Sequence, residues 1–513
     1  MTLTLLMLTP LVGALVLGVV PRTAERLAKT IAVGFSLAGL AGALAVLAEF
    51  DLHQTGFQLA EKHLWIKSFG VYYSLGVDGI GITLILLTAI LTPIVLLAGW
   101  DDVLPAGQRF HGYLAWMLGL EGLAFGVFSA TDAALFYALF EATLIPIFFL
   151  IGTYGTGQRT YAAVKFLIYN LVGGLLMLAS IIGLYYMSSK TGHPSFLLTD
   201  LVGLHMGSGV ERLLFVGFMA AFAIKAPLFP FHTWLPDAAA SATPSTAVLM
   251  VSVIDKVGTF GMLRWGLGLF PGAAHWATPV VIVLAVVSVV YGALLAIGQD
   301  DLRRLIAFTS VSHFGFIILG LFAVTSTSTA GATFYMFNHG LSTAALFLVA
   351  GILIARRGSA SIADFGGVQK VAPVLSGILL IAGLSSLSLP GLAPFVSEFM
   401  VMAGTFTRYP VAAIVSVLAI VLAALYILVM YQRTMTGPLR EDNAGIRDLK
   451  PLEMASLAPA IVLMVGLGFF PQPLLNVINP AVDATLSRIG AGDPAPRTPH
   501  FPVDAASHEG SRK

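Results

Sequence analysis

The sequence predicts an all-α, polytopic membrane protein with about 14 transmembrane helices. Of its 513 residues, 57% are hydrophobic and only 10% are charged. A soluble domain carries about 25% charged residues, so this chain cannot cover a water-exposed surface. Its apolar runs are continuous over about 20 residues rather than alternating, which argues against a β-barrel. One span with its connection takes ~35 residues, and the length therefore accommodates about 14 spans.

Fourteen apolar runs lie between charged or Gly/Pro-rich breaks. The predicted spans are 3–20, 28–48, 78–99, 111–129, 133–152, 162–187, 212–236, 244–270, 277–298, 302–323, 329–355, 372–408, 410–431 and 452–471. No basic residue precedes the first run, so we expect a retained helix rather than a cleaved signal. Residues 49–77 are mixed in polarity, and we expect them to lie along the interface as a helix or a loop.

Prolines interrupt two of these spans. Unwound backbone at membrane depth is tolerated only where protein or a water-filled cavity surrounds it. We therefore expect broken helices at spans seven and twelve, each beside an ionisable side chain. The prolines at the breaks are Pro227 and Pro230 in the seventh span, and Pro390 and Pro394 in the twelfth.

The two breaks occupy matching places in the chain. Pro227 lies 116 residues after the start of the fourth run at 111, and Pro390 lies 113 residues after the start of the ninth at 277. This spacing predicts two five-helix units, and an odd number of crossings turns the second upside down. The predicted parts are three N-terminal helices (1–110), the two inverted repeats (111–270 and 277–432), and a last helix with an outer tail (433–513).

The positions of Lys and Arg predict the orientation. With the N-terminus outside, the inward connections hold fourteen Lys and Arg residues, Arg22 among them, and the outward connections hold five. The positive-inside rule therefore favours an outer N-terminus. The tail after Arg488 is rich in Pro, Gly, Ser and Ala, and we expect it to be loosely ordered. The net charge of +1 gives no indication of a nucleic-acid partner.

Four basic residues remain inside the predicted spans. Lys165 and Arg264 lie near span ends, where their side chains can extend to the interface. Lys225 and Lys256 lie about twelve residues into their helices, roughly 18 Å from the end and so near the bilayer midplane.

Acidic and histidine side chains are found at similar depth. They are Glu121, Glu141, Asp255, Glu398, His313 and His339. Each charge at the bilayer centre costs at least ~2.5–3.5 kcal/mol. Taken singly, each could be a buried ion pair that fixes packing, or a histidine bonded to a carbonyl. Taken together, they favour a proton or ion relay. Neighbouring helices are ~8–10 Å apart, so we expect trapped water to bridge the groups.

Four segments resemble the antiporter-like subunits of respiratory complex I, and the likeness extends over residues 80–432. They are FAIKAPLFPFHTWLPDA (Phe222 to Ala238), QDDLRRLIAFTSVSHFGF (Gln299 to Phe316), ADFGGV (Ala363 to Val368) and FYALFEATLIPIFFLIG (Phe136 to Gly152). Within that family the chain is most similar to the M-type subunits. Glu398, and His339 followed by Thr343, stand where the L and N types have Lys. Asp255 departs from the pattern, and we expect it to face away from the relay because adjacent helical positions are ~100° apart.

The resemblance implies a proton-translocating membrane-arm subunit of an NADH–quinone oxidoreductase. Its implied regulatory pair is Glu141 and Lys225, and its implied relay is Lys256 and His313 followed by His339 and Glu398, with Glu121 and Asp255 as accessory groups. It also implies that redox chemistry, flavin, iron–sulfur clusters and quinone belong to partner subunits. This chain has no cysteine and no nucleotide motif, so it carries no cofactor of its own in this interpretation. The membrane would be a bacterial cell membrane.

Two other functions stay open at this point. One is a subunit of a multisubunit sodium/proton antiporter or of a membrane-bound hydrogenase complex, which its copurifying chains would reveal. The other is a haem- or quinone-binding oxidoreductase with His313 and His339 as ligands, which an absorption spectrum would reveal.

Overall fold

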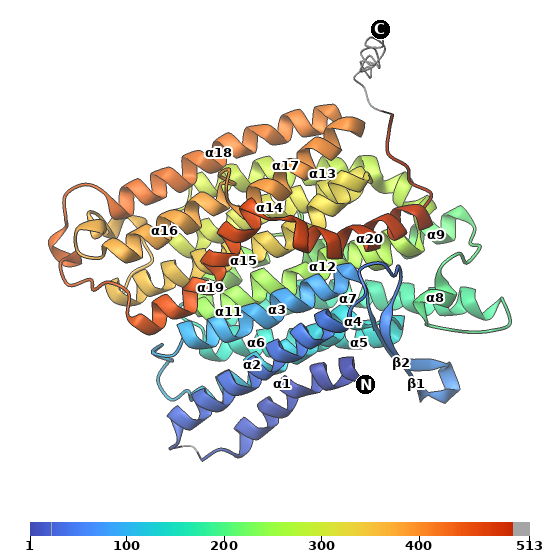
Figure 1. The fold of residues 1–513 in the computed structure, drawn as a ribbon, viewed down its shortest axis with the longest axis horizontal. Helices are drawn as coiled ribbons and strands as arrows, with labels where there is room; N and C mark the ends of the chain where they lie inside the picture. The colour runs from blue at the N-terminus through green and yellow to red at the C-terminus, as the bar shows by residue number, and fades with distance from the viewer. Residues whose placement is uncertain (22, 496–513) are drawn as a thin grey trace, which may run out of the picture.

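The computed structural model describes residues 1–21 and 23–495. The helices form a bundle in which most axes run roughly parallel, with a small hairpin at one end (Figure 1). Within the described residues, twelve segments are long and apolar enough to cross a membrane. The predicted all-α, multi-pass membrane fold is confirmed, and the count of fourteen stays a prediction. Arg22 and the tail beyond residue 495 lie outside the described residues.

The helices and strands follow in chain order. The helices are α1 (Thr2–Val19), α2 (Glu25–Glu49), α3 (Gly79–Ala98), α4 (Phe110–Ser129), α5 (Ala133–Ala142), α6 (Leu144–Tyr154), α7 (Arg159–Ser189), α8 (Leu198–Leu201), α9 (Ser208–Lys225), α10 (Trp234–Ser241), α11 (Pro244–Val248), α12 (Asp255–Gly261), α13 (Pro271–Ile297), α14 (Leu302–Ala323), α15 (Ser326–Arg357), α16 (Pro373–Ser386), α17 (Ala393–Arg408), α18 (Pro410–Met435), α19 (Pro451–Phe469) and α20 (Gln472–Arg488). Two π-helical stretches, η2 (Leu249–Ile254) and η3 (Met262–Leu267), flank α12, and the strands are β1 (Gln58–Ile66) and β2 (Val71–Val77).

Residues 49–77 differ from both expectations, because they contain an antiparallel β-hairpin rather than a helix or a loop. Gly70 closes its turn with a positive φ of 65°, which glycine adopts without strain. Strand β2 is buried along its second half and meets the end of α4 through a bridge between Leu75 and Ala130. The backbone N–H of Leu3 donates to Glu61 of β1, which fixes the start of α1 to the hairpin. We call this end of the bundle the hairpin end.

Residues 472–488, which follow the last predicted span, form a further helix, α20, that was not predicted. Leu474, Leu475, Ile478 and Val482 are buried, and the helix packs against α3 and α15. Apolar residues three or four positions apart form one face of a helix. Its polar face interrupts the apolar run, so hydropathy along the sequence does not predict this helix.

The two predicted helix breaks are present. Helix α9 ends at Lys225, and residues 226–233 are not helical before α10 begins. Helix α16 ends at Ser386 and α17 begins at Ala393, with Pro394 in the first turn of α17. Proline removes a backbone donor and clashes with the preceding turn, so a helix ends before it.

Two further interruptions were not predicted. The fifth span is divided at Thr143 into α5 and α6. The eighth span alternates between α and π geometry around Lys256. Both irregularities fall beside ionisable residues of the predicted relay, and π-helical turns are frequent at functional sites.

The N-terminus of α16 is capped by a residue distant in sequence. The carboxylate of Asp448 accepts hydrogen bonds from the backbone N–H groups of Val374 (2.9 Å), Leu375 (2.8 Å) and Leu449 (2.8 Å). Partial burial alone would raise the pKa of the Asp448 carboxyl, but these three donors hold it below the usual value. Asp448 therefore ties the connection before α19 to the start of a broken helix.

Replacing Asp448 by Asn should accelerate amide hydrogen exchange at Leu375 about fivefold. Loss of a charged cap costs about 1 kcal/mol. Because the pKa of Asp448 is lowered in the folded protein, the stabilisation is present above about pH 3.9 and is lost as the pH falls through the lowered value. Asp442→Asn is the control, since its pair with Arg357 is exposed and worth little. Equal exchange in the unmodified and Asp448→Asn proteins would contradict the capping role.

Candidate functional site

Lys225 is held at the first helix break. It is the last residue of α9 and is fully buried. Its Nζ donates to Oγ1 of Thr143 at 3.2 Å and lies 4.9 Å from the ring centre of Phe140. Thr143 stands at the junction of α5 and α6, so the unpredicted division of the fifth span supplies the partner of Lys225.

Glu141 lies two residues before that junction. It is half-buried, and within the described residues its Oε1 has no hydrogen-bond partner. Its carboxylate packs against Gly174 of α7, where an added Cβ would collide with it. Among the described side chains no ion pair joins Glu141 to Lys225, but Lys225 bonds to Thr143, which lies two residues after Glu141. The predicted regulatory pair is therefore brought together without a direct bond.

Lys256 lies at the start of α12, between the two π-helical stretches. Its Nζ donates to the Val251 carbonyl at 2.8 Å and lies 2.7 Å from Nδ1 of His339. A charged ammonium has only donors, so Nδ1 accepts when Lys256 is protonated. Lys256 and His339 therefore make a direct contact through which a proton can pass.

His313 and Glu398 are joined through a tyrosine that the sequence reasoning did not select. The Tyr335 hydroxyl lies 2.6 Å from Nδ1 of His313 and donates to Oε2 of Glu398 at 2.7 Å. Ser388, in the break between α16 and α17, donates to the same Oε2 at 2.6 Å. Nε2 of His313 lies 3.4 Å from the hydroxyl of Ser386. Each of these side chains is buried.

The two histidines complete a succession of contacts. The ring centres of His313 and His339 are 5.2 Å apart. We call Lys256, His339, His313, Tyr335 and Glu398 the central chain. A haem between the histidines would have to separate rings whose centres are only 5.2 Å apart, and both nitrogens of His313 and one of His339 already have a protein partner. This geometry does not favour the haem interpretation.

The two accessory candidates lie outside the hydrogen bonds of the central chain. Glu121 is buried in α4 and faces Gly39 of α2, and within the described residues neither of its carboxylate oxygens has a hydrogen-bond partner. Asp255 is fully buried, and both of its oxygens are also without a partner there. No hydrogen bond or ion pair among the described residues joins Asp255 to the central chain, and its expected orientation away from the relay stays a prediction.

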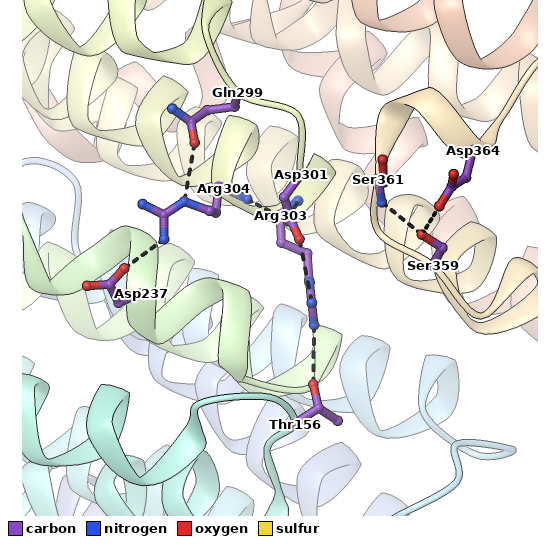
Figure 2. Close-up of polar contacts among 9 residues, drawn as sticks. All are labelled: Thr156, Asp237, Gln299, Asp301, Arg303, Arg304, Ser359, Ser361 and Asp364. Carbon is purple, nitrogen blue, oxygen red and sulfur yellow. Dashed lines mark hydrogen bonds and ion pairs between the residues drawn. The ribbon is translucent and has the colours of Figure 1, made fainter.

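The other two basic residues inside spans form ion pairs. Lys165 is 2.6 Å from Asp237, and Arg264 is 2.6 Å from Asp78 at the start of α3. Asp237 also binds Arg304 at 2.7 Å, and Arg304 donates to Gln299 (Figure 2). The depth of a residue within its predicted span does not reveal these partners, because they come from segments distant in the sequence.

The ion pair between Asp237 and Arg304 joins two of the motifs singled out in the sequence. Asp237 belongs to the segment Phe222 to Ala238, and Arg304 to the segment Gln299 to Phe316. Figure 2 shows Asp237 and Arg304 pointing toward one another from α10 and the start of α14. At the end of the bundle opposite the hairpin, this ion pair thus connects the first broken helix to the second half of the chain.

The chain also matches known proteins over most of its length. Residues 130–423 match the family described as NADH:quinone oxidoreductase/Mrp antiporter, TM. The chain is 50% identical to NADH-quinone oxidoreductase subunit M of Mycobacterium tuberculosis, over 98% of this chain and 97% of the relative. It is 36% identical to F(420)H(2) dehydrogenase subunit M of Methanosarcina mazei, over 94% and 97%.

A solved structure agrees with these matches. In respiratory complex I from Thermus thermophilus with bound NADH, one chain is 31% identical and superposes with a TM-score of 0.86. The match covers 95% of this chain and 100% of that chain. This protein therefore belongs to the family of NADH:quinone oxidoreductase and Mrp antiporter membrane subunits.

Proposed function

We propose that this chain is the proton-translocating M-type membrane subunit of an NADH–quinone oxidoreductase. The central chain is the observation that carries this function, because it links five buried proton-carrying side chains from Lys256 to Glu398. Proton transfer requires donor and acceptor within ~2.6–3.2 Å or one bridging water. Three of its four links meet that distance, and a water or ring rotation serves the contact between the histidines.

Glu141 and Lys225 control entry in this proposal. A carboxylate near a buried ammonium stabilises its charge, so movement of Glu141 away from Lys225 weakens the hold of Lys225 on its proton. Thr143 stabilises Lys225 from the same junction. The proton then passes to Lys256 through water, with Asp255 contributing charge to both lysines. Because the redox centres belong to partner subunits, the driving motion arrives from neighbouring membrane subunits.

The orientation follows from the charges. The N-terminus and the hairpin end face outward, and the end with Arg303, Arg304, Arg356 and Arg357 faces the cytoplasm of a bacterial cell. In this proposal residues 111–270 and 277–432 are the two inverted units, and each contains one of the two predicted helix breaks. Lys225 then serves the inward half and Glu398 the outward half.

A subunit of a sodium/proton antiporter is the competing function. The family description includes Mrp antiporters, but the 50% identity over 98% of the chain favours the oxidoreductase. The Methanosarcina relative belongs by name to a dehydrogenase of F(420)H(2). We therefore expect the partner chains, and not this one, to determine the electron donor.

Purification of the native assembly through an affinity tag on this chain tests the proposal. We expect copurifying chains with flavin and iron–sulfur absorbance, NADH-dependent quinone reduction, and proton uptake after reconstitution into vesicles. An assembly that lacks flavin and exchanges sodium for protons without a reductant would contradict it and support the antiporter.

A further inference from the structure

Tyr335 occupies a position that packing alone does not explain. Its side chain is fully buried, and its hydroxyl contacts two ionisable groups from two other helices, His313 of α14 and Glu398 of α17. A tyrosine hydroxyl is both a donor and an acceptor. It can therefore accept a proton from one neighbour while giving its own to the other.

Helix α15 fixes the order of these contacts. Tyr335 and His339 are four residues apart and so lie on the same face of the helix. His339 contacts Lys256, and Tyr335 contacts Glu398. The ring centre of His313 lies 5.2 Å from that of His339 and 5.8 Å from that of Tyr335. One regular helix thus presents consecutive proton carriers to both sides of His313.

The break before α17 completes the arrangement. Ser388 lies in this break with a positive φ of 58°, a backbone conformation that non-glycine residues rarely adopt. Its hydroxyl and that of Tyr335 both donate to Oε2 of Glu398. Two hydrogen bonds hold that oxygen facing Tyr335, in position to receive a proton.

Resting on the proposed function, we infer that the Tyr335 hydroxyl carries the proton from His313 to Glu398, in place of a water molecule. The Nδ1–H bond of protonated His313 breaks as a bond forms to the Tyr335 oxygen. The original Tyr335 O–H bond breaks as the proton joins Oε2 of Glu398. His313 becomes neutral, Glu398 becomes a neutral acid, and Tyr335 is neutral before and after. Rotation of the hydroxyl hydrogen resets it once Glu398 has released its proton.

Tyr335→Phe and Tyr335→Ser separate a relay from a packing role. Phe keeps the ring but removes the hydroxyl, so NADH-driven proton uptake in reconstituted vesicles should fall at least about tenfold. Ser removes the ring and leaves more than the ~30 Å³ that a water occupies, next to His313, Glu398 and Ser388. A water there can carry the proton, so uptake by the Ser variant should lie between those of the unmodified and Phe complexes.

If Tyr335 serves only in packing, proton uptake should be higher in the Phe variant than in the Ser variant, since Phe preserves the ring and Ser leaves a cavity. Uptake by the Phe variant that equals or exceeds that of the Ser variant would overturn the relay. Tyr426→Phe is the matched control: Tyr426 is also buried, and its hydroxyl has no hydrogen-bond partner within the described residues. Its uptake should be unchanged. Equal recovery of copurifying chains shows that each variant assembles.

Glu398→Gln in the same assay separates failure of this inference from failure of the proposed function. If Glu398→Gln lowers uptake and Tyr335→Phe does not, the tyrosine relay alone is overturned. If both variants pump like the unmodified complex, the proposed route through this chain is overturned with it. Loss in both variants, with the order described for Ser and Phe, supports the relay.

Discussion

Lys225→Ala should lower NADH-driven proton uptake at least about tenfold while leaving the complex assembled. Lys225 is fully buried, and its ammonium bonds to Thr143 at the junction beside Glu141. Alanine removes the group that receives the entering proton and leaves Glu141 without its cationic partner. The rates of NADH oxidation and proton uptake, measured on the same reconstituted vesicles, check this prediction.

Two controls accompany Lys225→Ala. Lys225→Arg keeps a positive charge but holds its proton too firmly to release it, so uptake should remain low. Lys190→Ala removes an exposed lysine at the end of α7 and should change nothing. Uptake at the unmodified rate in the Lys225→Ala complex would remove Lys225 from the mechanism.

Glu398→Gln should have an effect of similar size. The amide oxygen of Gln still accepts the hydrogen bonds of Tyr335 and Ser388, so the packing is kept. An amide cannot take up a proton, however, and the outward step should be blocked. We expect uptake to fall at least about tenfold.

Glu121→Gln provides the matched control, because Glu121 is also a buried glutamate inside a membrane helix. It faces α2 and makes no hydrogen bond with the central chain. Uptake should stay within about twofold of the unmodified complex, since no step of the proposed route uses it. Equal losses in both glutamine variants would show that any buried carboxylate is required, and would contradict a specific route.

The sequence predicted the parts of the site that depend on depth and on proline. Lys225, Lys256 and Glu398 stand out because a charge inside an apolar run is costly. The helix breaks followed from the loss of backbone donors at Pro227 and Pro390. These signals are local, so one chain without its structure is enough to detect them.

The remaining parts depend on contacts between distant segments. In the sequence, Tyr335 cannot be told apart from an aromatic residue that only packs in the core of an apolar helix. Only its hydrogen bonds to His313 and Glu398 distinguish it. Water was expected between all the groups, yet Lys256 and His339 touch directly. Helical periodicity does not reveal which of two faces meets a neighbour, and π-helical turns around Lys256 shift that face further.

The most direct test of the account is the number of protons taken up per NADH oxidised by complexes that contain Glu398→Gln. This ratio separates the proton route from the redox rate, because both quantities are measured in the same vesicles. If protons cross along the central chain, the ratio should be lower than in unmodified complexes with the same set of chains. An unchanged ratio in fully assembled Glu398→Gln complexes would contradict the route from Lys256 to Glu398 proposed for this chain.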